Sequence, residues 1–240
     1  MNQIKGIVLA GGTGSRLYPL TKVTNKHLLP VGREPMIFHA INKFVEAGIT
    51  DIMIVTGIDH MGDMVSQLGS GKSFNCHFTY RVQDEPGGIA QALYLAKDFA
   101  KGHPISVILG DNIFKDSLKP YLDGFLSQKE GARLILKEVE GPDRFGVATI
   151  DGEKLVKIVE KPDEPESNLA VTGIYFYDEK VFSYIETCKP SDRGELEITD
   201  VNNAYIQNGN CFFDQFKGWW SDAGTFDSLE YVNHIMKKEH

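Results

Sequence analysis

Apolar and polar positions along the first half of the chain form short apolar runs separated by amphipathic stretches. The runs predict strands buried in a sheet, and only the third alternates in polarity. They lie at residues 4–10, 51–56, 76–82 and 105–109. Apolar residues at helical spacing predict helices between these strands, at residues 35–47, 60–68 and 89–101. This order of strand and helix predicts a mostly parallel sheet with right-handed crossovers.

The pattern changes in the second half, after a predicted helix at residues 119–129. Strand-like segments with only short connections favour antiparallel pairing, and they lie at residues 132–139, 145–150, 155–160 and 169–177. The chain then continues with helices at 181–187 and 197–207, a strand at 211–216, a turn at 219–224 and a helix from Phe226. We therefore predict an α/β fold in a single domain over residues 1–240. Its Rossmann-like mixed, mostly parallel sheet is flanked by helices and carries a small antiparallel extension.

A glycine-rich loop follows the first predicted strand, where Gly11, Gly12 and Gly14 precede Arg16. Glycine allows a positive φ and removes the Cβ atoms that would keep a phosphate away from backbone N–H groups. Arg16 and Lys26 add positive charge beside those N–H groups. The loop therefore predicts a phosphate-binding cradle, although a glycine-rich turn with solvated lysines has the same composition.

The distribution of charge favours an anionic ligand at this loop. Residues 1–33 contain five basic residues and no acidic residue, whereas the whole chain has a net charge of −8. A net acidic protein is a poor partner for nucleic acid or an anionic membrane, but one basic segment can concentrate a small polyanion. We therefore expect a small phosphorylated ligand, no nucleic acid and no membrane.

Two familiar glycine motifs fit the chain poorly. The dinucleotide fingerprint needs glycines at its first, third and sixth positions, whereas the spacing here is Gly-Gly-x-Gly-x-Arg. Glu34 lies where a ribose-binding acid is expected, but it precedes a proline and is expected to cap a helix instead. Residues 69–73 imitate a P-loop, yet Ser66 stands where the first glycine is required. We expect a plain loop there.

Two carboxylates are candidates for metal binding. Asp111 follows the strand at 105–109, and Asp222 lies in a turn between tryptophan and glycine residues. An acid at the end of a buried strand commonly presents a carboxylate to Mg²⁺ at a phosphate site, and a turn-capping aspartate is the alternative. Mg²⁺ would neutralise charge in phosphoryl or nucleotidyl transfer, which needs no covalent catalyst. No Ser, Cys or His lies in a recognisable nucleophile motif.

Three further polar residues are candidates for substrate contacts. Glu160 and Lys161 end a predicted strand, where the alternation that points neighbours to opposite faces is less strict. Glu160 could then accept hydrogen bonds from sugar hydroxyls while Lys161 meets a sugar phosphate; a solvated surface pair is the alternative. Gln83 carries one acceptor and two donors, which can match the O4 and N3–H groups of a pyrimidine base.

Length and cysteine content narrow the class of protein. A chain of 240 residues suffices for one large domain, and no linker or low-complexity segment is evident. Cys76, Cys188 and Cys211 are odd in number and include no Cys-x-x-Cys pair, which favours reduced thiols over disulfides or a zinc site. No apolar stretch is long enough for a signal peptide or a membrane span. We expect a cytoplasmic protein.

Motifs along nearly the whole chain resemble those of the sugar-1-phosphate nucleotidylyltransferase family, in particular its glucose-1-phosphate thymidylyltransferases. They begin with Leu9-Ala10-Gly11-Gly12-Thr13-Gly14-Ser15-Arg16 and occur in the family's order. The matching segments are residues 9–21, 26–31, 83, 87–92, 109–112, 144–147, 160–162, 171–175, 193–200 and 220–225. The resemblance implies a nucleotide-binding half at residues 1–130 and a sugar-phosphate-binding half at 131–240.

The resemblance also implies a role for each matching residue. The nucleotide would contact Leu9, Gly11, Gly12, Gly14, Ser15, Arg16, Gln83, Gly88 and Asp111. The sugar phosphate would contact Gly146, Glu160, Lys161, Val171 and Tyr175. Arg16, Lys26 and Lys161 would be catalytic, with Arg16 on the side of the departing pyrophosphate. Asp111 and Asp222 would hold the Mg²⁺ cofactor.

The implied reaction is Mg²⁺-dependent transfer of a thymidylyl group from dTTP to α-D-glucose 1-phosphate. It gives dTDP-glucose and pyrophosphate, as the first step towards dTDP-rhamnose and related deoxysugars, in a homo-oligomer (dimer or tetramer). The alternative within the class is a UTP-using or other sugar-1-phosphate nucleotidylyltransferase. A non-catalytic nucleotide-sugar sensor and a Rossmann oxidoreductase are the alternatives outside it. The complete set of Arg16, Lys26, Asp111 and Asp222 disfavours the sensor.

The sequence departs from the family pattern at two places. Gly87-Gly88-Ile89 replaces the more usual Asp-Gly-Leu, which leaves the base preference open. The chain ends at His240 without the helical C-terminal extension of longer members, which in those members helps to build a second nucleotide site. We therefore expect dTDP-rhamnose to inhibit weakly, and only by competition in the active site.

Overall fold

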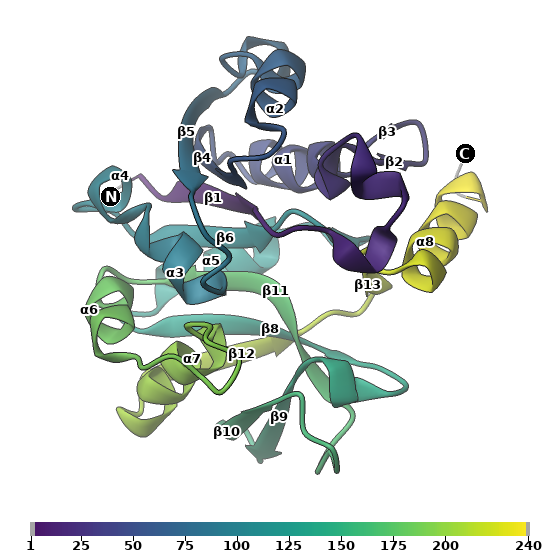
Figure 1. Cartoon of the computed structure of the whole chain (residues 1–240). Helices are drawn as coiled ribbons and strands as arrows, with labels where there is room; N and C mark the ends of the chain where they lie inside the picture. Colours follow the sequence, from purple (N-terminus) through teal and green to yellow (C-terminus); the bar gives the residue numbers. More distant parts are fainter. Residues whose placement is uncertain (1–2, 239–240) are drawn as a thin grey trace.

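The computed structural model describes residues 3–238, so the predicted domain limits and the chain end at His240 lie outside the described residues. Nine strands form one central sheet with helices on both of its faces (Figure 1). The strands are β1 (Lys5–Ala10), β4 (Asp51–Gly57), β5 (His77–Gln83), β6 (Ile105–Leu109), β8 (Ala132–Glu138), β9 (Gly146–Asp151), β10 (Lys154–Glu160), β11 (Leu169–Tyr177) and β12 (Cys211–Gln215). The predicted strands are therefore all present.

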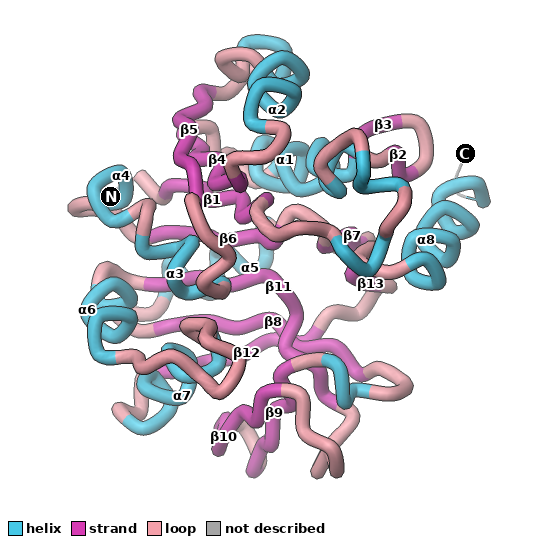
Figure 2. The backbone as a smooth tube through the Cα atoms, in the orientation of Figure 1, coloured by secondary structure: helices cyan, strands magenta, loops and turns pink. Residues whose placement is uncertain are grey.

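The sheet is parallel in its first half and mixed in its second. β5, β4, β1 and β6 lie side by side in parallel, and β11 continues the sheet antiparallel to β6. β8 pairs antiparallel with β11 but parallel with β12, so the predicted antiparallel pairing does not extend to β12. The β9–β10 hairpin joins at the beginning of β11 and lies at the bottom of Figure 2. The predicted fold class is confirmed.

Helices cover the two faces because successive side chains of each strand point to opposite sides. Ile7 and Leu9 pack under α3, α4, α6 and α7, whereas Val8 and Ala10 pack under α1, α2 and α5. A smaller apolar cluster fixes α8 against β13 (Trp220–Asp222) and against the hairpin of β2 (Pro30–Val31) and β3 (Glu34–Pro35). The helices are α1 (Met36–Glu46), α2 (Met61–Leu68), α3 (Ile89–Tyr94), α4 (Lys97–Ala100), α5 (Lys119–Ser127), α6 (Lys180–Thr187), α7 (Ile198–Gln207) and α8 (Phe226–Lys238).

The structure corrects several local predictions. The helix expected at residues 89–101 is divided into α3 and α4, because Ala96 leaves helical geometry with φ −89° and ψ 0°. Glu34 lies in the short strand β3 (Glu34–Pro35), paired with β2 (Pro30–Val31), and Pro35 precedes α1 without a side-chain cap. The expected turn at 219–224 contains the strand β13 (Trp220–Asp222), which pairs with β7 (Asn112–Phe114). Its partner lies more than a hundred residues away, so no local pattern indicates it.

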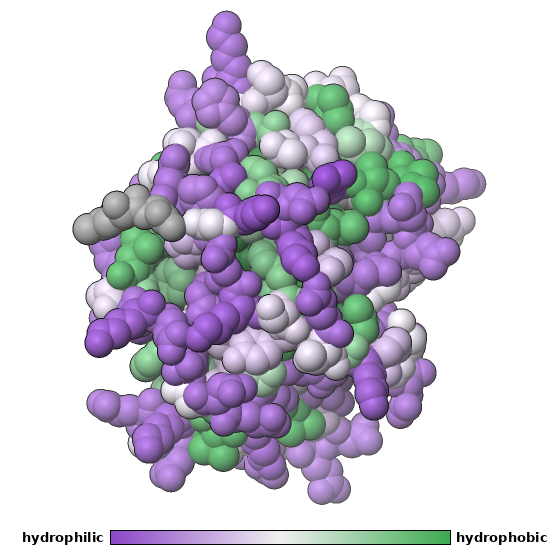
Figure 3. Space-filling model, turned by 90° about the vertical axis from the view of Figure 1, so that its left-hand side faces the viewer, coloured by the Kyte–Doolittle hydropathy of each residue, from purple (hydrophilic) through white to green (hydrophobic). Residues whose placement is uncertain are grey.

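The outer surface and the cysteines agree with a folded domain that has reduced thiols. Figure 3 shows a mostly hydrophilic face on which hydrophobic residues occur in small groups. Cys76, Cys188 and Cys211 form no disulfide. Within residues 3–238, no helix combines the length and apolar character needed to cross a membrane.

The order of the strands reverses at β1, and the residues that follow the strands lie at one end of the sheet. The chain passes from β1 to β4 on one side and later returns to β6 on the other side of β1. Ligands of open α/β sheets bind outside the carboxyl ends of strands at such a reversal. Gly11 follows β1 and Asp111 follows β6, so the sheet brings the glycine-rich loop and the first candidate metal ligand to the same place.

Candidate functional site

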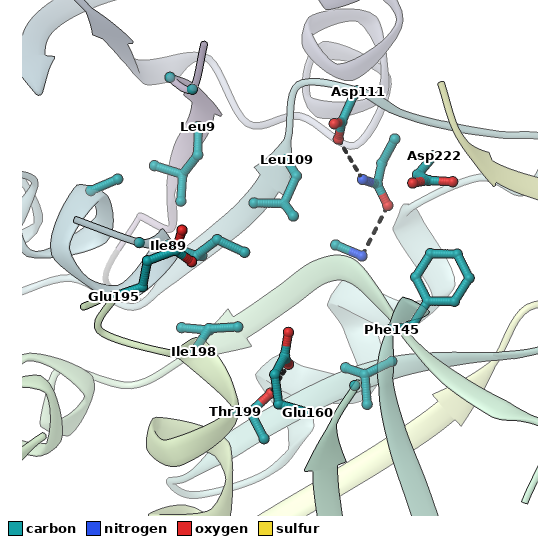
Figure 4. Close-up of a pocket in the computed structure, with 18 of the residues that line it drawn as sticks. Leu9, Ile89, Leu109, Asp111, Phe145, Glu160, Glu195, Ile198, Thr199 and Asp222 are labelled. Atoms are coloured by element: carbon teal, nitrogen blue, oxygen red, sulfur yellow. Dashed lines mark hydrogen bonds between the residues drawn. The ribbon is translucent and has the colours of Figure 1, made fainter. Parts of the chain in front are cut away.

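A cavity of about 360 Å³ opens at this edge and contains side chains from both halves of the chain (Figure 4). Most of the predicted site residues line it: Leu9, Gly11, Gly12, Arg16, Lys26, Gln83, Gly88, Asp111, Gly146, Glu160, Lys161, Val171, Tyr175 and Asp222. In Figure 4, Asp111 and Asp222 lie near one end, and Glu160 and Thr199 lie near the other. The cavity is large enough for a small-molecule ligand.

Gly14 and Ser15 do not line this cavity. Gly14 has φ +62°, and a Cβ there would stand 2.7 Å from Cγ2 of Thr21. Ser15 is exposed and begins a 3₁₀ turn, Ser15–Leu17, the first of three in the segment that leads to Lys26. The requirement for glycine at position 14 is therefore explained by the packing of the loop on itself.

Asp111 is buried and carries a charge-assisted hydrogen bond. Nζ of Lys26 lies 2.6 Å from its Oδ2. Burial disfavours the ionised carboxyl, but the charge of Lys26 and hydrogen bonds from Lys26 and Asn112 outweigh it and hold the pKa of Asp111 well below its usual range. His27 lies beside the pair, and burial together with Lys26 lowers the pKa of its imidazole to about 3. Asp111 is therefore an anion beside a neutral histidine at physiological pH.

Asp222 faces the same space from a different segment. β13 pairs Asp222 with Asn112, and the N–H of Ala223 donates to the carbonyl oxygen of Asp111 over 2.7 Å. Burial and the charge of Asp111 raise the pKa of Asp222 to about 6, although Arg144 opposes the shift. Nη2 of Arg144 lies 2.8 Å from Oδ1 of Asp222. The two carboxylates therefore differ in acidity, because burial and the charge of Asp111 dominate at Asp222, whereas Lys26 and Asn112 stabilise the ionised form of Asp111.

The space between the two carboxylates is bordered by Gly224. A Cβ on Gly224 would stand 3.4 Å from Oδ2 of Asp111, 3.6 Å from Oδ2 of Asp222 and 3.0 Å from Nη2 of Arg16. Among the described residues, no group of three or more His, Cys, Asp or Glu side chains could hold a metal ion. Two carboxylates fit an Mg²⁺ ion, which often takes only one or two from a protein and completes its shell with phosphate and water.

The glutamine that was expected to recognise a base is already engaged. Nε2 of Gln83 donates to the carbonyl oxygen of Gly88 (3.3 Å) and to Oε1 of Gln91 (2.7 Å). Both donors of its amide are therefore used within the protein, and only Oε1 remains for a ligand. In this arrangement Gln83 offers a pyrimidine base one acceptor, and its expected contact with both O4 and N3–H stays a prediction. Gln91, which sequence reasoning missed, fixes the orientation.

Glu160 and Lys161 lie on the same side of the strand end. Lys161 has φ +44°, and its N–H donates to the carbonyl oxygen of Phe145 (2.9 Å). This left-handed conformation breaks the alternation, and Nζ of Lys161 lies 3.7 Å from Oε1 of Glu160. Oγ1 of Thr199 on α7 donates to Oε2 of Glu160 over 2.6 Å. Each carboxylate oxygen of Glu160 thus has its own partner within the protein.

The family is established by comparison with known proteins. The family model of the nucleotidyl transferases matches residues 5–239, which is almost the entire chain. This chain belongs to the nucleotidyl transferase family. Glucose-1-phosphate thymidylyltransferase of Xanthomonas campestris pv. campestris (strain B100) is 44% identical over 240 residues, 98% of this chain and 81% of that protein. The enzyme of that name from Mycobacterium tuberculosis (strain ATCC 25618 / H37Rv) is 39% identical over 98% of this chain and 84% of its own.

Solved structures agree with the nucleotidyl transferase assignment. A protein of Bacillus anthracis in complex with sucrose, provisionally assigned as a glucose-1-phosphate thymidylyltransferase, is 61% identical with a TM-score of 0.94. The match covers 98% of this chain and 95% of that one. A UDP-glucose pyrophosphorylase complexed with UDP-glucose is 25% identical with a TM-score of 0.86, over 99% of this chain and all of the other.

Asn112 lines the cavity, and the sequence analysis matched its motif at residues 109–112 without giving this side chain a role. The side chain is buried, and its Nδ2 donates a hydrogen bond to Oδ1 of Asp111 (3.0 Å). Its Oδ1 accepts two hydrogen bonds, from the N–H of Gly173 (2.9 Å) and from Nε1 of Trp220 (2.8 Å). The hydrogen bond that Asp111 accepts is drawn as a dashed line in Figure 4. Because Oδ1 accepts twice, Nδ2 must face Asp111, so Asn112 fixes the orientation of that carboxylate. Its position beside Asp111 was the available signal.

We expect Gly224→Ala to weaken binding of a divalent cation about tenfold, which is about 1.4 kcal/mol, without changing the melting temperature. The added methyl group would enter the space between the carboxylates, and Gly224 lies outside the left-handed region, so alanine strains no backbone there. Calorimetric titration with Mn²⁺ measures the affinity. Gly62→Ala is the control, because its Cβ would meet nothing within 4 Å. Unchanged affinity in Gly224→Ala would place the cation elsewhere.

Proposed function

We propose that this nucleotidyl transferase moves the thymidylyl group of dTTP to α-D-glucose 1-phosphate and releases dTDP-glucose and pyrophosphate. The names and 38–44% identities of the thymidylyltransferase relatives support the choice of substrates. The observation that carries the proposal is the position of Asp111 and Asp222. They face one space in a cavity that Gly88 and Glu160 also line.

The proposed chemistry is a single in-line displacement. A phosphate oxygen of glucose 1-phosphate attacks the α-phosphorus of dTTP, and the bond to the bridging oxygen of the β-phosphate breaks with its electron pair on pyrophosphate. Mg²⁺, held by Asp111 and Asp222, would neutralise phosphate charge. Lys26 and Arg16 supply positive charge on the nucleotide side, and Lys161 supplies it on the sugar-phosphate side. No proton needs to be transferred in this step.

The two ends of the cavity hold the non-reacting parts of the substrates. Oε1 of Gln83 accepts the N3–H of thymine, since both amide donors of Gln83 are used by Gly88 and Gln91. Glu160 accepts hydrogen bonds from glucose hydroxyls, oriented by Thr199 and Lys161. Holding both substrates in this way places the reacting groups next to each other and makes the bimolecular reaction effectively unimolecular.

The proposal is tested by measuring pyrophosphate release with a panel of nucleoside triphosphates and sugar 1-phosphates in the presence of Mg²⁺. We expect the highest kcat/KM with dTTP and glucose 1-phosphate. A clear preference for ATP or GTP would contradict the base assignment. The absence of pyrophosphate release with every pair, together with tight binding of a nucleotide sugar, would favour a sensor.

We expect UTP to be a measurable but poorer substrate than dTTP. Thymine and uracil present the same N3–H to Gln83 and differ by one methyl group, whose contact is worth only about 1–3 kcal/mol. The kcat/KM for UTP is therefore expected to be roughly 10- to 200-fold lower. Competition between the two nucleotides in one reaction measures the ratio. Equal use of both nucleotides would mean that no apolar contact receives the methyl group.

A further inference from the structure

Arg144 is the cationic residue of the cavity for which neither the motifs nor the proposed reaction has assigned a role. It ends the 3₁₀ turn Pro142–Arg144 before β9, and its guanidinium lies over the ring of Phe145, 4.8 Å from the centroid. Nη2 lies 2.8 Å from Oδ1 of Asp222, on a segment almost eighty residues away. The side chain of Arg144 is 42% exposed and that of Asp222 only 13%. Arg144 therefore covers a largely buried carboxylate from the open side of the cavity.

This contact places a positive charge beside the carboxylate of Asp222, where it opposes the approach of another cation. Oδ2 of Asp222 faces Gly224 and Asp111, while Oδ1 accepts from Arg144. Nζ of Lys26 contacts Oδ2 of Asp111, the oxygen that itself faces Gly224. In the free protein the two carboxylates are thus paired with Lys26 and Arg144, and Arg16 lies near the same space. A divalent cation that enters this site meets the repulsion of these side chains, unless an anion draws one of them away.

The position of Arg144 indicates which anion would do this. Arg144 and Lys161 both line the cavity. The carbonyl oxygen of Phe145, the residue after Arg144, accepts a hydrogen bond from the N–H of Lys161, so the two side chains belong to adjoining parts of the cavity wall. An arginine offers five donors in a planar fork that suits a phosphate group. Its partial exposure leaves the guanidinium room to move, whereas Asp222 is fixed by the pairing of β13 with β7.

We propose that Arg144 exchanges partners during binding: it neutralises Asp222 in the free protein and releases it to bind the phosphate of the sugar 1-phosphate. Binding of the divalent cation and of the sugar phosphate then becomes cooperative, because each favours the same position of Arg144. This proposal rests on the function proposed above for the identity of the anion. The effect on the cation alone requires no substrate.

The first test is the affinity for Mn²⁺ without substrates, measured by electron paramagnetic resonance of the free ion. Arg144→Ala removes the competing cation and is expected to bind Mn²⁺ about threefold to tenfold more tightly than the wild type, the range expected when a partly exposed ion pair no longer competes. Arg144→Lys keeps the charge and should stay within about twofold of the wild type. Arg133→Ala is the matched control, because Arg133 pairs with Asp214 at 2.7 Å outside the cavity.

The second test separates the phosphate contact from the effect on the cation. In Arg144→Ala the KM for glucose 1-phosphate should rise about tenfold, the loss of one charge-assisted contact, while the KM for dTTP changes by less than about twofold. Saturating glucose 1-phosphate should tighten Mn²⁺ binding less in Arg144→Ala than in the wild type, since the shared residue is absent.

Three outcomes would overturn the exchange. They are an unchanged or weaker Mn²⁺ affinity in Arg144→Ala, an equal increase in both KM values, and the same tightening by sugar phosphate in both proteins. Failure of the proposed function would look different: the wild type would release no pyrophosphate from dTTP and glucose 1-phosphate, whereas the comparison of Mn²⁺ affinities would still be measurable.

Discussion

Asp111→Asn and Asp222→Asn are each expected to lower turnover at least about a hundredfold, on the order of 3 kcal/mol of barrier. Each substitution removes one negative charge from the pair that faces the space beside Gly224. Asparagine keeps the shape and one acceptor oxygen, so the loss reports charge and metal coordination and not packing. Steady-state rates of pyrophosphate release at saturating Mg²⁺ measure the effect.

Relative to the wild type, the two substitutions should have different effects on the stability of the fold. The pKa of Asp222 is raised to about 6, so at pH 7 its ionised form is less favourable in the folded chain than in the unfolded chain, and a neutral asparagine removes this cost. The pKa of Asp111 is lowered, so its charge stabilises the fold above its unfolded pKa, and Asp111→Asn loses that stabilisation together with the partner of Lys26. At pH 7 we expect Asp222→Asn to melt no lower than the wild type and Asp111→Asn to melt several degrees lower.

Asp214→Asn is the matched control, since it also breaks an arginine pair, but outside the cavity. Its turnover should equal that of the wild type. Wild-type turnover in a folded Asp111→Asn or Asp222→Asn protein would remove that residue from the reacting site. Melting curves without metal separate this outcome from simple unfolding.

Arg16→Ala and Lys161→Ala should each lose about ten- to a hundredfold in kcat/KM, but for different substrates. Arg16 reaches the Asp222 end of the cavity, where its Nη2 would stand 3.0 Å from a Cβ on Gly224. Lys161 lies at the other end beside Glu160. We therefore expect Arg16→Ala to raise the KM for dTTP and Lys161→Ala to raise the KM for glucose 1-phosphate.

Each substrate is varied at saturation of the other to separate these effects. Both side chains are largely exposed, so the melting temperatures should remain close to that of the wild type. Lys22→Ala provides a control for loss of positive charge, because Lys22 lies on the same basic segment but does not line the cavity. The same loss for both substrates in both variants would contradict the division of the cavity into nucleotide and sugar-phosphate ends.

Local pattern in the sequence was sufficient to predict most of the fold. A strand such as β1 is recognisable because its apolar run must be covered on both faces, and a helix such as α1 because its apolar residues recur at helical spacing. The alternation of these elements restricts the sheet to a few topologies. The same topology places the residues after β1 and β6 at one edge, so Gly11 and Asp111 could be predicted to lie together.

Tertiary structure decided the rest of the site, because these relations depend on contacts between residues far apart in the chain. The pairing of β13 with β7 brings Asp222 to Asp111, and no local pattern encodes a partner that distant. The φ of Lys161 turns its side chain towards Glu160. Gly88 and Gln91 accept the hydrogen bonds of the Gln83 amide, and Arg144 covers Asp222. The sequence by itself thus determined which residue types were present and on which elements, whereas packing determined their partners, orientations and charge states.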